Sequence, residues 1–199
     1  MEISRAVLSA ALLASLLGAG GCMSRVKTSA QADAAGAALD RRELAEATVS
    51  HWANVPALAA RRMMEEYGPP DEVHADRLVW LHNSPWRRTV VLNERSGFGV
   101  PPSERDVVEQ SVDYSMTPRQ AREVEEFDRS VTYNPRDQAL TSRADDEAHN
   151  FLRLNLADDI VNGRLTPKAA SLSYASIVTF EQAGKTSPYL LGLRFIPQP

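Results

Sequence analysis

The chain has 199 residues, of which 43% are hydrophobic and 24% are charged, and its formal net charge is −4 at pH 7. These values are ordinary for a globular domain with a buried core. The negative net charge argues against nucleic acid as a partner, because binding to a phosphate backbone needs a strong positive field.

The first 22 residues have the three-part arrangement of a secretory signal. Arg5 precedes the apolar stretch Ala6–Leu17, and a run of small residues leads to Cys22, the only cysteine of the chain. The apolar stretch is too short to remain as a membrane-spanning helix. This pattern resembles the lipobox of bacterial lipoproteins, which implies that residues 1–21 are a signal peptide and that palmitate-type acyl chains are attached to Cys22. The alternative is an ordinary secretory signal in which the cysteine is incidental.

Residues 22–39 are predicted to form a lipidated, flexible tether. The segment is rich in Ala, Ser, Gln and Gly and has almost no large apolar side chain, so it cannot bury enough surface to become ordered. Two or more acyl chains anchor a protein stably in a bilayer. Met23 and Ser24 follow the cysteine, and by resemblance to sorting in double-membrane bacteria this implies the inner leaflet of the outer membrane, with the folded part facing the periplasm.

Residues 40–199 are predicted to form a single α+β domain, in which a small antiparallel sheet of three or four strands is packed with several helices. In the first part, residues 40–114, the spacing of apolar residues indicates helices over 40–53 and 56–67, and Gly68 ends the second helix. Runs rich in β-branched and aromatic residues then predict three strands. These strands are residues 77–81, 87–92 and 107–114.

A local resemblance covers part of residues 56–114. The junction Tyr67–Val73 (YGPPDEV), followed by Arg77–Trp80 (RLVW), resembles the helix–Gly-x-Pro–strand–Trp junction of outer-membrane lipoproteins of the BamE/SmpA type. Members of that family pack two helices on a three-stranded antiparallel sheet and help outer-membrane protein assembly by contacting protein partners. The resemblance therefore implies a binding role without catalysis. That family has no counterpart to the helical part of this chain after Thr117.

The second part of the domain, residues 115–199, is predicted to be mainly helical with a final strand. Thr117 and Thr166 each precede a proline, and each pair supplies a helix cap and a first helical residue. The expected elements are helices over 117–130, 142–162 and 166–183, an extended piece at 131–133, and a last strand at 189–195.

The hairpin tip between the first two predicted strands is the expected binding surface. An exposed tryptophan beside arginine is typical of an interface anchor, and it can also stack on a sugar. The alternative is that the two tryptophans pair across the strands over the core while the arginines face water. The residues concerned are Trp80, His82, Trp86, Arg87 and Arg88.

The helix predicted over residues 142–162 carries polar residues within or beside its apolar face. Asp145 and His149 lie four residues apart, as do Asn155 and Asp159, so the members of each pair can converge. One hypothesis is a periplasmic hydrolase-type enzyme that uses Asp145, His149 and Asp159. The alternative is helix capping and hydrogen bonding between helices.

No catalytic or metal-ligating set is assigned from the sequence, and no cofactor is expected. The four histidines are dispersed, and the sequence has no Gly-x-Ser-x-Gly elbow and no phosphate-binding glycine loop before a helix. The expected function is therefore a binding or assembly component of the cell envelope, anchored in membrane lipid through Cys22 and contacting an envelope protein. A hydrolase and a module that binds cell-wall polymer are the alternatives, and the sequence carries no indication of oligomeric state.

Overall fold

A computed structural model describes residues 21–94 and 106–198, with side chains from residue 33 onward. The chain divides into two units, residues 1–37 and 38–199. Most of the predicted signal peptide and the side chain of Cys22 lie outside the described residues. Within the described ranges, no helix combines the length and the apolar character needed to cross a membrane.

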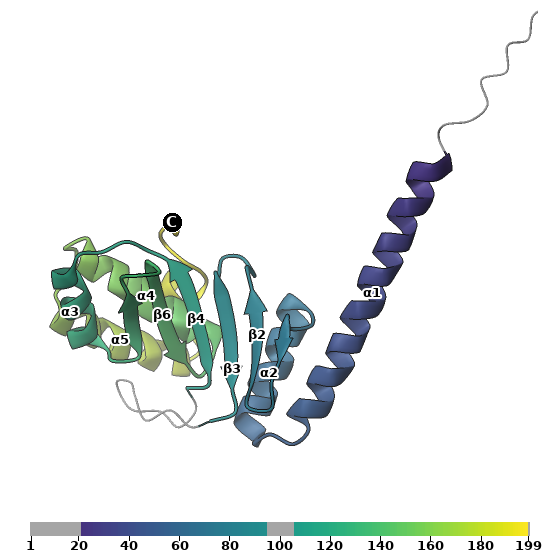
Figure 1. The fold of residues 1–199 in the computed structure, drawn as a ribbon. Helices are drawn as coiled ribbons and strands as arrows, with labels where there is room; N and C mark the ends of the chain where they lie inside the picture. The colour runs from purple at the N-terminus through teal and green to yellow at the C-terminus, as the bar shows by residue number, and fades with distance from the viewer. Residues whose placement is uncertain (1–20, 95–105, 199) are drawn as a thin grey trace, which may run out of the picture. The chain divides into compact units, whose positions relative to one another are not determined.

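The described residues form five α-helices, six strands and one 3-10 helix (Figure 1). The helices are α1 (Gly21–Val49), α2 (Asn54–Tyr67), α3 (Pro118–Phe127), α4 (Glu147–Val161), α5 (Pro167–Gln182) and the 3-10 helix η1 (Pro188–Leu190). The strands are β1 (Glu72–Val73), β2 (Arg77–Leu81), β3 (Arg88–Leu92), β4 (Val108–Asp113), β5 (Val131–Asn134) and β6 (Ala139–Ala144).

Helix α1 covers the segment for which the sequence predicted a flexible tether. The backbone is helical through residues 22–39, and the helix ends at Val49 rather than near residue 53. Alanine is the strongest helix former, so an alanine-rich segment can be helical without burying an apolar face. The side chains of residues 33–39 are accordingly mainly exposed. Whether this segment tethers the domain to a membrane stays a prediction.

The six strands form one antiparallel sheet in the order β1-β2-β3-β4-β6-β5. The predicted α+β class and the antiparallel pairing are confirmed, but the predicted size of three or four strands is wrong. The second part of the domain, predicted to be mainly helical, is helical only in part, because residues 131–134 and 139–144 form strands β5 and β6. Residues 142–144 were expected to begin the long helix. Strand β6 instead pairs with β4 on one side and β5 on the other, so distant neighbours determine its conformation.

The predicted last strand at residues 189–195 is also wrong. Residues 188–190 form the 3-10 helix η1, and the following residues are irregular. Their backbone groups bind a side chain of α4 instead of a neighbouring strand. The amide of Asn155 donates to the carbonyl oxygens of Tyr189 at 3.1 Å and Gly192 at 2.9 Å, and its oxygen accepts from the backbone N–H of Arg194 at 2.7 Å.

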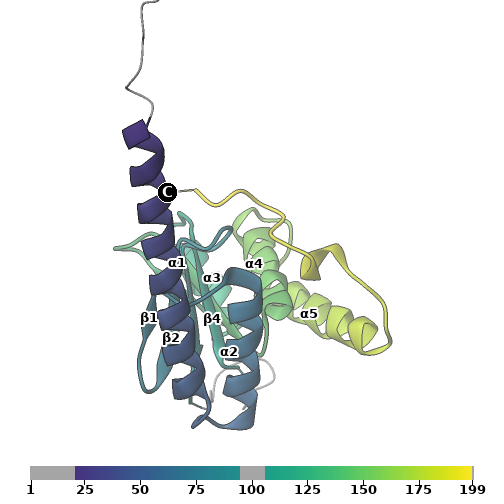
Figure 2. The ribbon, with the colours of Figure 1, turned by 90° about the vertical axis from the view of Figure 1, so that its right-hand side faces the viewer.

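Helices α2 and α4 cover the same face of the sheet (Figure 2). Leu78, Val91, Val108 and Ala144 face one another in register across four strands and are fully buried on that face. One hydrophobic cluster packs α2 and the end of α1 on β2 and β3, and a second packs α3, α4 and α5 on β4, β5 and β6. The two clusters leave the start of α4 beside α2, where the candidate site lies.

Candidate binding pocket between α2 and the start of α4

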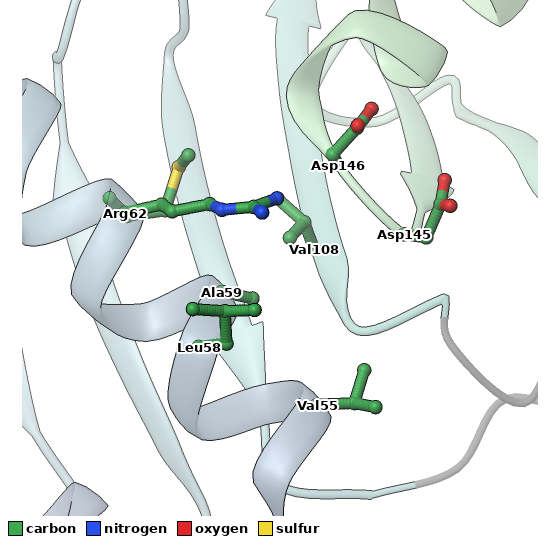
Figure 3. Close-up of a pocket in the computed structure, with 8 residues that line it drawn as sticks. Val55, Leu58, Ala59, Arg62, Val108, Asp145 and Asp146 are labelled. Atoms are coloured by element: carbon green, nitrogen blue, oxygen red, sulfur yellow. The ribbon is translucent and has the colours of Figure 1, made fainter.

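A pocket of about 290 Å³ opens between α2 and the turn that joins β6 to α4 (Figure 3). Helix α2 supplies an apolar wall and one arginine, and the turn supplies two carboxylates on the other side. The lining residues are Val55, Leu58, Ala59, Arg62, Met63, Val108, Asp145 and Asp146.

The apolar wall follows from the three- and four-residue spacing along α2. Residues 55, 58, 59, 62 and 63 lie on neighbouring positions of one helical face. Ala59 and Met63 are buried against the sheet, whereas Val55 is 43% exposed and Leu58 is 53% exposed. Pro56 lies in the first turn of the helix, where its missing N–H leaves no hydrogen bond unmade. The pocket therefore presents apolar surface that the other described residues leave exposed.

Arg62 is the cationic group of the pocket. Its side chain extends from α2 toward Val108 in Figure 3. Across residues 33–94 and 106–198, no hydrogen bond or ion pair joins Arg62 to another side chain or to the backbone. A guanidinium group has five N–H donors, so this one is available to an acceptor from outside.

The carboxylates belong to the residues that begin α4. Asp146 is the N-cap, and its Oδ1 accepts the backbone N–H of His149 at 2.9 Å. Oδ1 of Asp145 lies 2.5 Å from His149 Nδ1. The other ring nitrogen, Nε2, lies 2.9 Å from Oε2 of Glu181 on α5. The imidazole is thus held between carboxylates from two different helices.

These contacts determine the protonation of the cluster. The hydrogen bond with Asp145 raises the pKa of His149 to about 9 against the opposing effect of burial, and the negative charges of Asp145 and Asp146 and the hydrogen bond to Glu181 add to the rise. Burial, the largest single effect, raises the pKa of Asp145, but the hydrogen bond from His149, the charges of His149 and Arg153 and a backbone hydrogen bond together hold it below its ordinary value. A pKa of about 9 keeps His149 an imidazolium at neutral pH, hydrogen-bonded to the ionised carboxylate of Asp145.

Protonation limits the chemistry of this cluster. One ligand atom from each of Asp145, Asp146 and His149 lies within 4.8 Å of the others, which is close enough for a metal ion. A metal ligand must be an unprotonated imidazole, so an ion would have to displace a proton that two carboxylates stabilise. A general base must also be unprotonated at the working pH. As a cation, His149 instead positions Asp145 at the edge of the pocket.

The residues of the hypothetical hydrolase do not converge. Asp145 and His149 do meet, as their spacing indicated. Asp159 lies 14 positions beyond Asp145, which corresponds to about 20 Å along a helix. Its carboxylate accepts from Arg164 Nε at 2.5 Å and from the hydroxyl of Tyr189 at 2.6 Å, so it has structural partners. The other predicted polar residue, Asn155, holds the C-terminal segment.

The two tryptophans of the predicted hairpin surface are buried, each with 2% exposure. Trp80 donates from Nε1 to the carbonyl oxygen of Gly68 at 3.0 Å, and Trp86 donates from Nε1 to Glu147 Oε1 at 2.5 Å and stacks on Phe151 with ring centroids 4.9 Å apart. They belong to different hydrophobic clusters, so they do not pair across the strands either. Burial over the core is the alternative that the structure favours.

The charged residues of the hairpin also have partners in the sheet. Arg87 forms an ion pair with Asp113 at 3.1 Å, and Arg88 lies 3.6 Å from Glu109. His82 is exposed. The hairpin tip therefore does not combine an exposed aromatic anchor with unpaired arginines.

Glu147 connects the pocket to the hairpin through the core. Its Oε1 accepts from the hydroxyl of Tyr67 and from the indole of Trp86, and from Gln110 Nε2 at 2.8 Å. Burial, together with the hydrogen bond to Glu147, raises the pKa of Tyr67 above its ordinary value. These hydrogen bonds connect the end of α2, the hairpin and β4 to the first turn of α4. They therefore link the two sides of the pocket.

Sequence reasoning missed the α2 side of the site. The apolar spacing of that helix indicates a buried face, but it does not show that Val55 and Leu58 lie beyond the area that the sheet covers. Nothing in the sequence distinguished Arg62 as a binding residue, because arginines occur throughout the chain. Only the folded structure shows that Val55, Leu58 and Arg62 lie beside the start of α4.

The chain matches no protein-family model, no curated protein sequence and no solved structure. The resemblances to bacterial lipoproteins and to the BamE/SmpA type therefore stay predictions, carried by the residues quoted for them. The function has to be argued from the pocket and from the N-terminal sequence.

Proposed function

We propose that the protein is a lipid-anchored binding component of the cell envelope, and that the pocket between α2 and the start of α4 receives its ligand. The observation that supports this best is the exposure of Val55 and Leu58 inside a pocket flanked by charged groups. Each Å² of apolar surface removed from water contributes roughly 25 cal/mol, so a ligand that covers these side chains gains affinity. Apolar surface with a few convergent polar groups is typical of binding sites.

The membrane attachment in this proposal comes from the N-terminal sequence. An apolar stretch and a run of small residues end at Cys22, and acyl chains on that cysteine would hold the domain at the inner leaflet of the outer membrane, facing the periplasm. The ligand would then be an envelope protein within reach of an anchored domain.

The two rival functions have less support. A hydrolase built on Asp145, His149 and Asp159 would need the three side chains to converge, whereas the carboxylate of Asp159 is bound by Arg164 and Tyr189 instead. A cell-wall polymer module built on the tryptophan hairpin would need an exposed indole face, whereas Trp80 and Trp86 are buried.

Site-specific photo-crosslinking in living cells tests the pocket. A photoreactive amino acid replaces Leu58, and as a matched control it replaces Leu172, a leucine on the surface of α5 that is 66% exposed and lies outside the pocket. We expect a discrete crosslinked product from position 58 that is absent from position 172. No product from position 58, or the same products from both positions, would contradict a binding role for the pocket.

Metabolic labelling tests the anchor separately. We expect radioactive palmitate to be incorporated into the wild-type protein and not into the Cys22→Ser variant. An unlabelled wild-type protein would show that the cysteine is not acylated and would remove the anchor from the proposal.

A further inference from the structure

We infer that the ligand of this pocket is a peptide segment of a protein partner in which an apolar side chain lies next to a lysine or arginine. This inference rests on the proposed binding function and names the chemical class of the ligand. It is carried by three features that the described residues show: carboxylate oxygens that no other residue binds, an exposed apolar wall, and a guanidinium without a hydrogen-bond or ion-pair partner.

The carboxylates favour a cationic group. Asp145 and Asp146 each use Oδ1 for a contact with His149, and no other residue in the described part of the chain donates a hydrogen bond to either Oδ2. Their side chains are 34% and 39% exposed. An ionised carboxylate accepts several hydrogen bonds, so both groups retain capacity for a donor from outside.

The charge around this end of the pocket is negative in total. Asp145, Asp146 and Glu181 surround the ring of His149, and Arg62 stands on the α2 side of the same pocket, so three acidic groups face two basic groups. The imidazolium is only 14% exposed and both its nitrogens are directed at carboxylates. An incoming group at this end therefore meets carboxylates, which attract a lysine or arginine and repel an anion.

The α2 side favours an apolar side chain followed by a hydrogen-bond acceptor. Val55 and Leu58 offer exposed apolar surface, and Met63 closes the wall behind them. Arg62 stands on the same helix and has no acceptor within residues 33–94 and 106–198. A peptide carbonyl oxygen is an acceptor that every residue of a peptide supplies. A peptide carrying one apolar and one basic side chain meets all three features, whereas a metal ion or a simple amine leaves the wall and Arg62 unused.

The first test compares the binding of three labelled octapeptides to the full-length protein in detergent, measured by fluorescence polarisation. The peptides share an alanine and glycine background and differ in one central pair: Leu-Arg, Leu-Glu or Ser-Arg. We expect the Leu-Arg peptide to bind about tenfold more tightly than the Leu-Glu peptide, because a charge-assisted hydrogen bond contributes at least that factor. We expect about a fivefold advantage over the Ser-Arg peptide from the apolar contact. Equal binding of the three peptides would overturn the inference.

The second test uses variants that leave the fold intact. Asp146→Asn removes the charge but keeps a side chain that caps a helix equally well, and Leu58→Ser removes an exposed apolar group. We expect the first variant to lose the preference for Leu-Arg over Leu-Glu and the second to lose the preference for Leu-Arg over Ser-Arg. Leu172→Ser is the matched control and should bind like the wild type. Wild-type selectivity in both pocket variants would place the peptide elsewhere and overturn the inference.

The outcomes separate this inference from the function on which it rests. A crosslink from position 58 in cells without peptide selectivity in vitro would reject the ligand class and keep the binding role. No crosslink and no selectivity would reject both. Stoichiometric Zn²⁺ binding that competes with the Leu-Arg peptide and is lost in Asp146→Asn would reassign the carboxylates to a cation site and overturn the peptide assignment.

Discussion

The contacts of His149 predict how the free energy of unfolding depends on pH. Its ring lies between Asp145 and Glu181, at 2.5 Å and 2.9 Å, with Asp146 at 3.8 Å. The aromatic ring of Tyr174 on α5 lies 6.5 Å away between ring centroids. The perturbation is a rise in pH that removes the proton, compared in the wild type and in His149→Gln.

The expected magnitude follows from the pKa of the folded protein. The pKa of His149 rises from 6.5 in the unfolded chain to about 9 in the fold, so folding is stabilised by the bound proton. At about 1.4 kcal/mol per pH unit, this difference corresponds to at most about 3.5 kcal/mol. The partners Asp145 and Glu181 are 34% and 36% exposed, so solvent screening reduces the figure toward about 1–2 kcal/mol. The stabilisation is complete below pH 6.5 and is lost as the pH rises through about 9.

Urea unfolding followed by tryptophan fluorescence measures this effect, because Trp52, Trp80 and Trp86 are all buried in the fold. Between about pH 6 and about pH 10 the wild type should lose about 1–2 kcal/mol more than His149→Gln, which should already be less stable at the lower pH. His82→Gln, at an exposed histidine, should behave like the wild type. Equal pH dependence in the wild type and His149→Gln would refute the reasoning, as would a wild type that gains stability as the pH rises.

Two further predictions concern polar groups in the core. Arg153 is 2% exposed and lies 2.9 Å from Asp128 and 3.5 Å from Asp106, both of which are buried. The Arg153→Ala variant removes the cation between these two carboxylates, so it should lower the free energy of unfolding by about 3–5 kcal/mol. An effect below about 1 kcal/mol in urea unfolding would show that this ion pair is not desolvated as described. Asn155→Leu should release the C-terminal segment that its amide binds, lowering stability by about 1–3 kcal/mol. Faster amide hydrogen exchange at Arg194 checks this, and unchanged exchange there would contradict it.

Several elements could be predicted because their signals are local. Gly68 ends α2 with a φ of 79°, a conformation that glycine adopts without strain. Thr117 and Thr166 cap α3 and α5, accepting the backbone N–H groups of Gln120 and Ala169. Strands β2 and β3 were indicated by their β-branched and aromatic residues. In each case the residues that determine the structure lie within a few positions of it.

The missed elements depend on contacts over long distances in the sequence. Residues 139–144 become a strand because β4 and β5 offer hydrogen bonds on both sides, and the C-terminal segment avoids becoming a strand because Asn155 binds its backbone. The indole of Trp86 is buried because Glu147, 61 positions away, accepts its N–H. A composition rich in tryptophan and arginine does not reveal whether such partners exist.

Only part of the candidate site could be predicted from the sequence, for the same reason. The spacing of Asp145 and His149 indicated their contact, since four residues span one helical turn. The third carboxylate, Glu181, comes from α5, and the wall of Val55 and Leu58 comes from α2. Helix ends respond mainly to near neighbours, whereas strand pairing, exposure and charge balance depend on the distant elements that pack alongside. Helices α2, α3 and α5, the helix caps and strands β2, β3 and β4 could therefore be predicted from the sequence, whereas the pocket depends on α2 and the start of α4 lying side by side.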